Sequence, residues 1–195
     1  FVAELATASE LTVYFQSASA EEVAGVRQAA EMVGMLGKKV FVDRGEEASI
    51  HLADNLAGAV LVSPAVAGDV NEAELLRVLH PGGKLVLPTK EILKPFPPGI
   101  DDWSYPYHGP DNNPQSNDTV AKGPYLTQFL ARPYYAPLPQ LATASAGRIF
   151  KAYGHIAFKP REEPLLNSLV AYNGYNGTML WKRKITPGLM VHRNI

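Results

Sequence analysis

The chain has no cysteine among its 195 residues. That absence excludes disulfide bonds, thiolate zinc sites and cysteine nucleophiles, but it does not fix the cellular compartment. The formal net charge is only −1, which argues against a nucleic-acid partner held by bulk electrostatics. No apolar run approaches the roughly 20 residues of a membrane span, so we expect no such span. The hydrophobic content of 46% is typical of a globular core.

Proline is scarce before residue 81 and dense between residues 81 and 139. Such a shift in composition marks a domain seam. We therefore predict three parts, which are an α/β domain over residues 1–94, a Pro-rich linker over 95–137, and a β-rich segment over 138–195.

The first part alternates short apolar strands with amphipathic helices. Strands are expected over residues 11–16, 39–43, 59–63 and 84–87. Helices are expected over residues 1–8, between the Ser19/Glu22 capping box and Gly37, and over 71–79. This alternation predicts a doubly wound parallel sheet with helices on both faces. Pro81, Gly82 and Gly83 predict a tight reversal between the last helix and its strand.

The run 75–87, LLRVLHPGGKLVL, resembles the late part of the S-adenosylmethionine (SAM) dependent methyltransferase fold. Residues 50–62 resemble that family's approach to its fourth strand. The resemblance implies a partial, Rossmann-like domain whose first strand and glycine-rich loop lie before Phe1. A parallel sheet without its central strand leaves backbone groups unpaired. We therefore expect missing portions of the same protein, or a partner chain, to complete it.

The same resemblance implies a SAM pocket, with SAM as a possible cofactor. Gln16 stands where the family has an acidic residue that holds the ribose hydroxyls, and Glu46 or Glu47 would lie near the adenine. The alternative is that Gln16 is an ordinary strand-end residue and the two glutamates form a solvated loop pair. No catalytic residue is implied.

The linker is polar, aromatic and rich in turn-forming residues. Asp101, Asp102, His108 and Asp111 have ligand-type side chains, but their spacing fits no helix face or known ligand pattern, so we expect no metal site. The interpretation that remains is an ordered connection packed through Trp103 and neighbouring tyrosines. A short helix is expected over 125–130.

The last part has the pattern of an antiparallel sheet. Strands are expected over residues 140–145, 148–153, 168–172 and 178–184. Tight turns are expected at Ala146-Gly147 and over 173–177. We interpret the charged runs 161–163 and 182–184 as solvated faces.

The run 169–185 resembles the repeat of pyrroloquinoline-quinone (PQQ) type β-propellers. The matching positions are Ala171, Tyr172, Asn173, Gly177, Leu180 and Trp181. The resemblance implies a single propeller blade, with further blades supplied by chain beyond Ile195 or by a partner. The segment has no vicinal cysteines and no acidic cluster with calcium-ligand spacing, so PQQ itself is not expected.

Taken together, the chain resembles planctomycete-type proteins that join a methyltransferase-like region to a PQQ-like propeller. The fold class implied is a partial Rossmann-like α/β domain followed by an all-β, propeller-blade-like segment. We expect a non-catalytic binding or scaffold protein. The alternatives are a SAM-dependent methyltransferase and, less favoured, a quinone-dependent dehydrogenase. The two halves indicate opposite compartments, cytoplasmic and exported.

Overall fold

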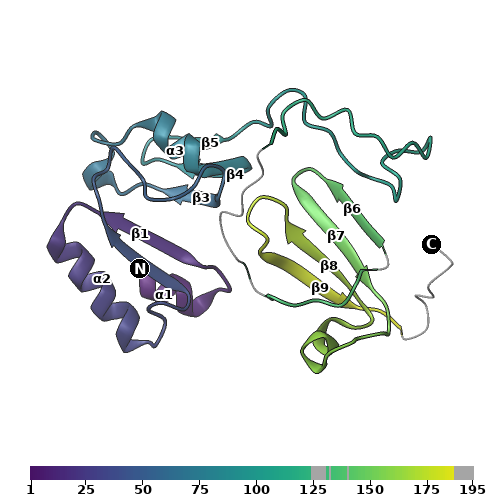
Figure 1. The fold of residues 1–195 in the computed structure, drawn as a ribbon. Helices are drawn as coiled ribbons and strands as arrows, with labels where there is room; N and C mark the ends of the chain where they lie inside the picture. The colour runs from purple at the N-terminus through teal and green to yellow at the C-terminus, as the bar shows by residue number, and fades with distance from the viewer. Residues whose placement is uncertain (124–130, 132, 140, 187–195) are drawn as a thin grey trace. The chain divides into compact units, whose positions relative to one another are not determined.

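The computed structural model describes residues 1–123, 131, 133–139 and 141–186 (Figure 1). The chain divides into two compact units. Unit 1 comprises Phe1–Leu79 and Lys84–Ile92, and unit 2 comprises His80–Gly83 and Leu93–Ile195. The helix predicted over 125–130 lies outside the described residues. None of the helices in the described ranges is long and apolar enough to cross a membrane.

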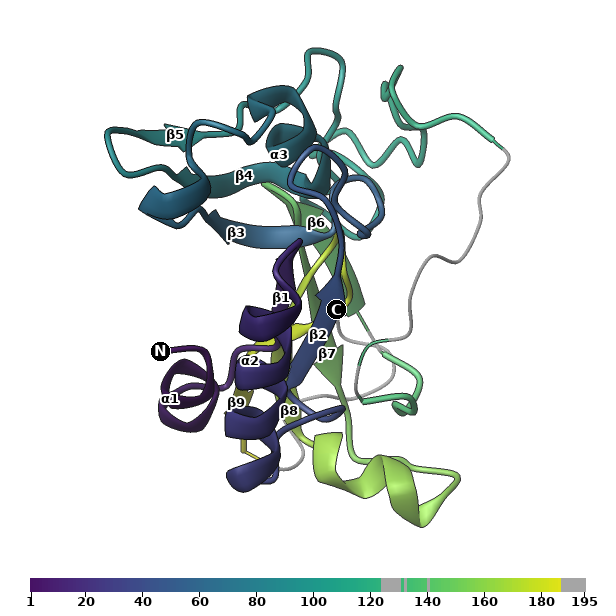
Figure 2. The same cartoon turned by 90° about the vertical axis from the view of Figure 1, so that its left-hand side faces the viewer.

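Unit 1 begins with two helices packed on a pair of parallel strands. In chain order these are α1 (Val2–Ala8), β1 (Val13–Ser17), α2 (Ala20–Met32) and β2 (Val40–Arg44). The two strands pair from Val13 opposite Val40 onward. Figure 2 shows α2 running along this pair, and the buried Ala6, Ala30 and Val40 form the core between them. The predicted helices and strands of this segment are confirmed.

The ends of α2 illustrate how local chemistry sets an element's length. The Ser19 hydroxyl accepts the backbone N–H of Glu22 at 3.3 Å, so the predicted N-cap is confirmed. The Glu22 carboxylate instead accepts the Ser17 hydroxyl at 2.6 Å. The helix stops before Gly34, which adopts φ of 69°, so the prediction of Gly37 as the stop was wrong.

The rest of unit 1 forms a second sheet. In chain order its elements are β3 (Ala57–Leu61), the 3-10 turn η1 (Pro64–Val66), α3 (Glu72–Val78), β4 (Leu79–Val86) and β5 (Glu91–Leu93). The strands lie in the order β3-β4-β5, with β3 and β4 parallel. Leu75, Leu79 and Leu85 are buried together and supply the core under this sheet.

The predicted reversal at Pro81-Gly82-Gly83 was wrong. These residues continue β4 in extended form, and burial alternates along the strand from Leu79 to Val86. The pairing of β4 with β3 is irregular at these residues. Ala57 pairs with Leu79, but Ala59 pairs with Lys84, so β4 contains extra residues between the two pairs. Gly82 takes φ of 76°, and its N–H donates to a carbonyl after β5. The chain therefore turns at the end of α3, and the glycines absorb a bulge in β4.

The expected Rossmann-like sheet is not formed. Among the described residues, β1 and β2 make one sheet, β3, β4 and β5 make another, and no ladder joins β1 to β3. The local alternation of strands and helices is enough to predict each pair of parallel strands. Whether two pairs share one sheet depends on long-range pairing, which periodicity does not encode. The doubly wound, methyltransferase-like fold class is thus corrected to two small sheets.

Unit 2 is built on a four-stranded antiparallel sheet. Its elements are β6 (Leu141–Ser145), β7 (Arg148–Tyr153), the 3-10 helix η2 (Pro160–Leu165), β8 (Ser168–Asn173) and β9 (Met179–Lys184), with strand order β6-β7-β8-β9. The predicted tight turn is confirmed, because Ala146 and Gly147 both have positive φ, as a type I′ hairpin requires. The propeller-blade interpretation is corrected to one four-stranded antiparallel sheet, because the described strands form no propeller.

The two faces of this sheet differ in what covers them. On one face Tyr153, Val170 and Tyr172 pack with Leu165 of η2 into the main core of the unit. On the other face the rings of Phe150 and Trp181 are in contact, with centroids 6.1 Å apart. The sheet therefore has one well-buried face and one face that carries partly exposed aromatic side chains.

Candidate functional site

The amide of Gln16 is fully occupied by the protein itself. Its Nε2 donates to the carbonyls of Glu46 and Ser49, at 2.9 and 2.8 Å. Its Oε1 accepts the Tyr14 hydroxyl and the His51 N–H, both at 2.9 Å. A side-chain amide has two donor hydrogens and an oxygen with two lone pairs, so all of its capacity is used. The structure therefore places Gln16 as a clamp on the loop after β2.

The two glutamates of the predicted SAM pocket lie on that clamped loop. Glu46 contributes its backbone carbonyl to Gln16 and has an exposed side chain. Glu47 lies within 3.4 Å of the Ala18 N–H through one carboxylate oxygen. Gly45 lets this loop approach closely, because a Cβ there would lie 2.7 Å from Gln16 Nε2. The structure thus joins Gln16 to Glu46 through a backbone carbonyl, with Glu47 on the same loop.

An acidic and a histidine side chain meet at the carboxyl ends of β1 and β2. The Asp43 carboxylate accepts His51 Nδ1–H at 2.7 Å, and this bond is the main reason that the pKa of Asp43 is lowered. Burial, together with Asp43, raises the pKa of Tyr14 to about 12. The His51 side chain is 46% exposed, so its second nitrogen can reach solvent. Sequence reasoning missed this pair, because the two residues lie on different elements.

Asp101 and Asp102 of the linker accept hydrogen bonds from backbone and side-chain groups of the protein. Asp101 accepts the Asn117 N–H at 2.6 Å and His108 Nε2–H at 2.7 Å, and these bonds lower its pKa. Asp102 accepts the Ser145 hydroxyl and the Ala146 N–H. Among the described residues, no three metal-ligating side chains converge.

Within the described part of the linker, the backbone around Trp103 contacts the sheet. The backbone of Trp103 pairs with that of Ala144 in both directions, at 2.8 and 2.7 Å. The side chains of Tyr105 and Tyr107 are about half exposed, so the packing expected of them is not seen.

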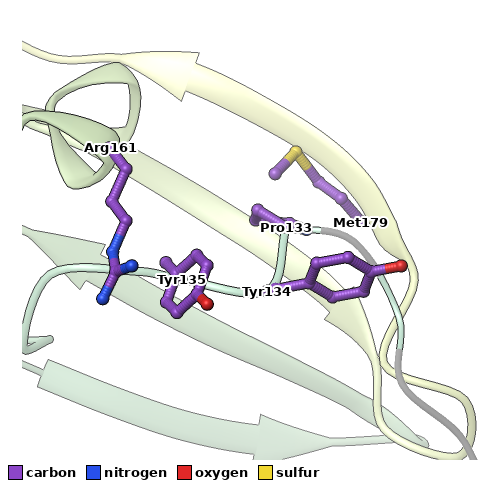
Figure 3. Close-up of a pocket in the computed structure, with 5 residues that line it drawn as sticks. All are labelled: Pro133, Tyr134, Tyr135, Arg161 and Met179. Atoms are coloured by element: carbon purple, nitrogen blue, oxygen red, sulfur yellow. The ribbon is translucent and has the colours of Figure 1, made fainter.

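A shallow, solvent-open hollow of about 510 Å³ lies in unit 2 (Figure 3). Its walls are contributed by the linker, η2 and β9, and its lining residues are Pro133, Tyr134, Tyr135, Arg161 and Met179. The Arg161 guanidinium lies 3.5 Å from the centre of the Tyr135 ring, a cation–π contact. Tyr134 and Tyr135 are 58% and 50% exposed. In the sequence, this stretch is marked only by its density of prolines and tyrosines, which predicts a linker and does not indicate a hollow.

The hollow has the composition of an interaction site. Tyrosine and arginine are the side chains most enriched in the energetically important centres of protein interfaces. No carboxylate forms an ion pair with Arg161 within the described part of the chain, and this exposed residue is stacked on the Tyr135 ring. Such an arrangement can bind an acidic group beside an apolar one.

Comparison with known proteins gave no assignment. No protein-family model matches the chain, and neither a curated protein nor a solved structure is significantly similar to it. The resemblance to planctomycete-type proteins therefore stays a prediction.

Proposed function

We propose that this protein acts by binding, as an interaction or scaffold protein, through unit 2. The observation that carries the proposal is the hollow, where Tyr134, Tyr135 and Met179 present apolar surface beside the stacked Arg161. Exposed aromatic side chains beside an arginine are typical of surfaces that meet a partner.

The state of the predicted cofactor residues supports the same proposal. Gln16 has no remaining hydrogen-bonding capacity for a ribose hydroxyl. Glu47 lies near the N–H of Ala18. Binding a nucleoside at this place would require the loop after β2 to open and lose those contacts.

A screen of immobilised peptides with the full chain tests this proposal. The double variant Tyr134→Ser/Tyr135→Ser should lose a defined subset of the peptides that the unmodified chain binds. Tyr107→Ser is the matched control, because Tyr107 is an equally exposed tyrosine of the linker at 59%. A set of bound peptides that is the same for the unmodified chain and the double variant would overturn the proposal.

An enzyme remains a second candidate, because the Asp43–His51 pair lies where parallel strands commonly present ligand sites. A SAM-dependent methyltransferase is the activity to test there. Titration calorimetry of the full chain with SAM discriminates the two proposals. Micromolar binding that is weakened by His51→Ala would favour the enzyme, and an absence of heat would favour the binding protein.

A further inference from the structure

Strand β9 forms an edge of the sheet in unit 2. On one side it pairs with β8, and among the described residues no strand pairs with its other side. The Ile185 N–H bonds to the Asn167 carbonyl at 2.9 Å, which sets the phase of the ladder. Because antiparallel strands alternate their bonding direction, the backbone groups of Lys182 and Lys184 point to the outer edge. Those groups are a template for an additional strand.

The same edge carries three consecutive positive charges. The ammonium groups of Lys182 and Lys184 reach the carbonyls of Pro164 and Leu166, at 3.4 and 2.9 Å, rather than any carboxylate. Arg183 lies on the opposite face of the strand, since it pairs with Leu169. No ion pair neutralises these three residues within the described ranges. A second copy of β9 would be repelled, whereas an acidic strand would be attracted.

The aromatic hollow borders the first residue of β9 on the core face of the sheet. Met179 is the first residue of β9, and it packs on the core face beside Tyr172. Arg161 of η2 lines the same hollow, as Figure 3 shows. A strand added to β9 would therefore pass the hollow at one end and the charged run at the other.

We propose that β9 receives an extended acidic segment of a partner protein, which pairs with its outer edge. An apolar or aromatic side chain of that segment enters the hollow, and a neighbouring carboxylate bonds the in-plane N–H groups of Arg161. Further carboxylates of the segment lie against Lys182 and Lys184 on one face of the strand and against Arg183 on the other, because neighbouring residues of a strand point to opposite faces. Backbone bonds supply affinity in this mode of recognition, and the pocket and the charges supply specificity. The inference rests on the binding function proposed above and names the partner's chemistry.

Fluorescence anisotropy with labelled synthetic peptides tests this inference on the full chain. The probe is a peptide of roughly eight residues, the length of a strand, in which pairs of Glu alternate with pairs of Val and a Tyr stands at one end, so that carboxylates lie on both faces. A second peptide replaces every Glu by Lys, and a third replaces alternate Val residues by Pro, which removes backbone donors. We expect the first peptide to bind at least about tenfold more tightly than either of the others.

Charge-reversal variants make the test specific to this edge. Arg183→Glu should weaken the binding of the acidic peptide and strengthen the binding of the Lys peptide. Arg161→Gln should weaken the binding of the acidic peptide and leave the affinity for the Lys peptide unchanged. Arg148→Glu is the control, because Arg148 is an exposed arginine at the start of β7. Circular dichroism of each variant checks that the fold is retained.

Several outcomes would overturn the inference. One is equal binding of the Pro-containing peptide or of heparin, since either would show attraction by charge alone. Another is a concentration-dependent dimer in sedimentation that Arg183→Glu abolishes, since it would assign the edge to a second copy. If the peptide screen finds hollow-dependent ligands but the acidic peptide does not bind, the inference fails while the proposed binding function stands.

Discussion

Replacing Gln16 separates a structural role from a ligand-binding role. Gln16→Met keeps the length of the side chain and removes its four hydrogen bonds to the protein. The site is partly exposed, so each bond contributes at the lower end of the usual range, about 0.5–1 kcal/mol. We therefore expect the free energy of unfolding to fall by about 2–4 kcal/mol in urea denaturation followed by circular dichroism.

Gln16→Glu makes the contrast sharper. A carboxylate can still accept from Tyr14 and from the His51 N–H, but it cannot donate to the carbonyls of Glu46 and Ser49. We expect a loss of about 2 kcal/mol, from two missing bonds and the repulsion between carboxylate and carbonyl oxygens. If Gln16 held a ribose, the same change would introduce the acidic residue of the methyltransferase pattern and tighten SAM binding.

The control is Gln28→Met, because Gln28 lies on the exposed side of α2. Its replacement should change the free energy of unfolding by no more than about 0.5 kcal/mol. The clamp would be refuted if Gln16→Met were as stable as the control variant. It would also be refuted if Gln16→Glu kept full stability and gained measurable affinity for SAM in calorimetry.

Three further outcomes can be measured on the same chain. Hydrogen bonds from Arg77 and from the backbone lower the pKa of Glu74 to about 2 from its usual 4.5, so stability should fall as the pH drops through that interval. Glu74→Gln should remove that part of the pH dependence, measured as urea midpoints. Leu85→Ala, at a fully buried position of β4, should lower the free energy of unfolding by about 3 kcal/mol in the same assay. At the hairpin between β6 and β7, Gly147→Ala should destabilise the protein by about 1–2 kcal/mol, because Gly147 has φ of 72°. Ala146→Asn should stabilise it by about 0.5 kcal/mol in thermal melts, since Asn tolerates positive φ.

Elements whose signals are local could be predicted from the sequence. Ser19 starts α2, and Ala146-Gly147 closes the hairpin, because an N-cap and a type I′ turn each depend on neighbours only a few residues away. The prediction of a reversal at Pro81-Gly82-Gly83 failed because the same residues suit both a reversal and a bulge. The pairing of β4 with its neighbouring strands selects the bulge.

The candidate site could be predicted only in part. The composition of the linker indicated an ordered aromatic connection, but it did not indicate that Tyr134 and Tyr135 meet Arg161 and Met179. Those residues come from three elements with no common periodicity, so no pattern in the sequence links them. The role of Gln16 was equally hidden, because its two acceptor carbonyls lie 30 and 33 residues along the chain.

The sequence by itself determined α1, α2, α3, the strands β1, β2 and β3, and the four antiparallel strands of unit 2. It did so because caps, turns and alternating burial are interactions between near neighbours. Only the tertiary structure decided that the parallel strands divide into two sheets and that the Gln16 amide is hydrogen-bonded to the loop after β2. It also decided that β9 carries a charged edge near an aromatic hollow. Each of these depends on contacts between distant residues, whose free energies no local pattern records.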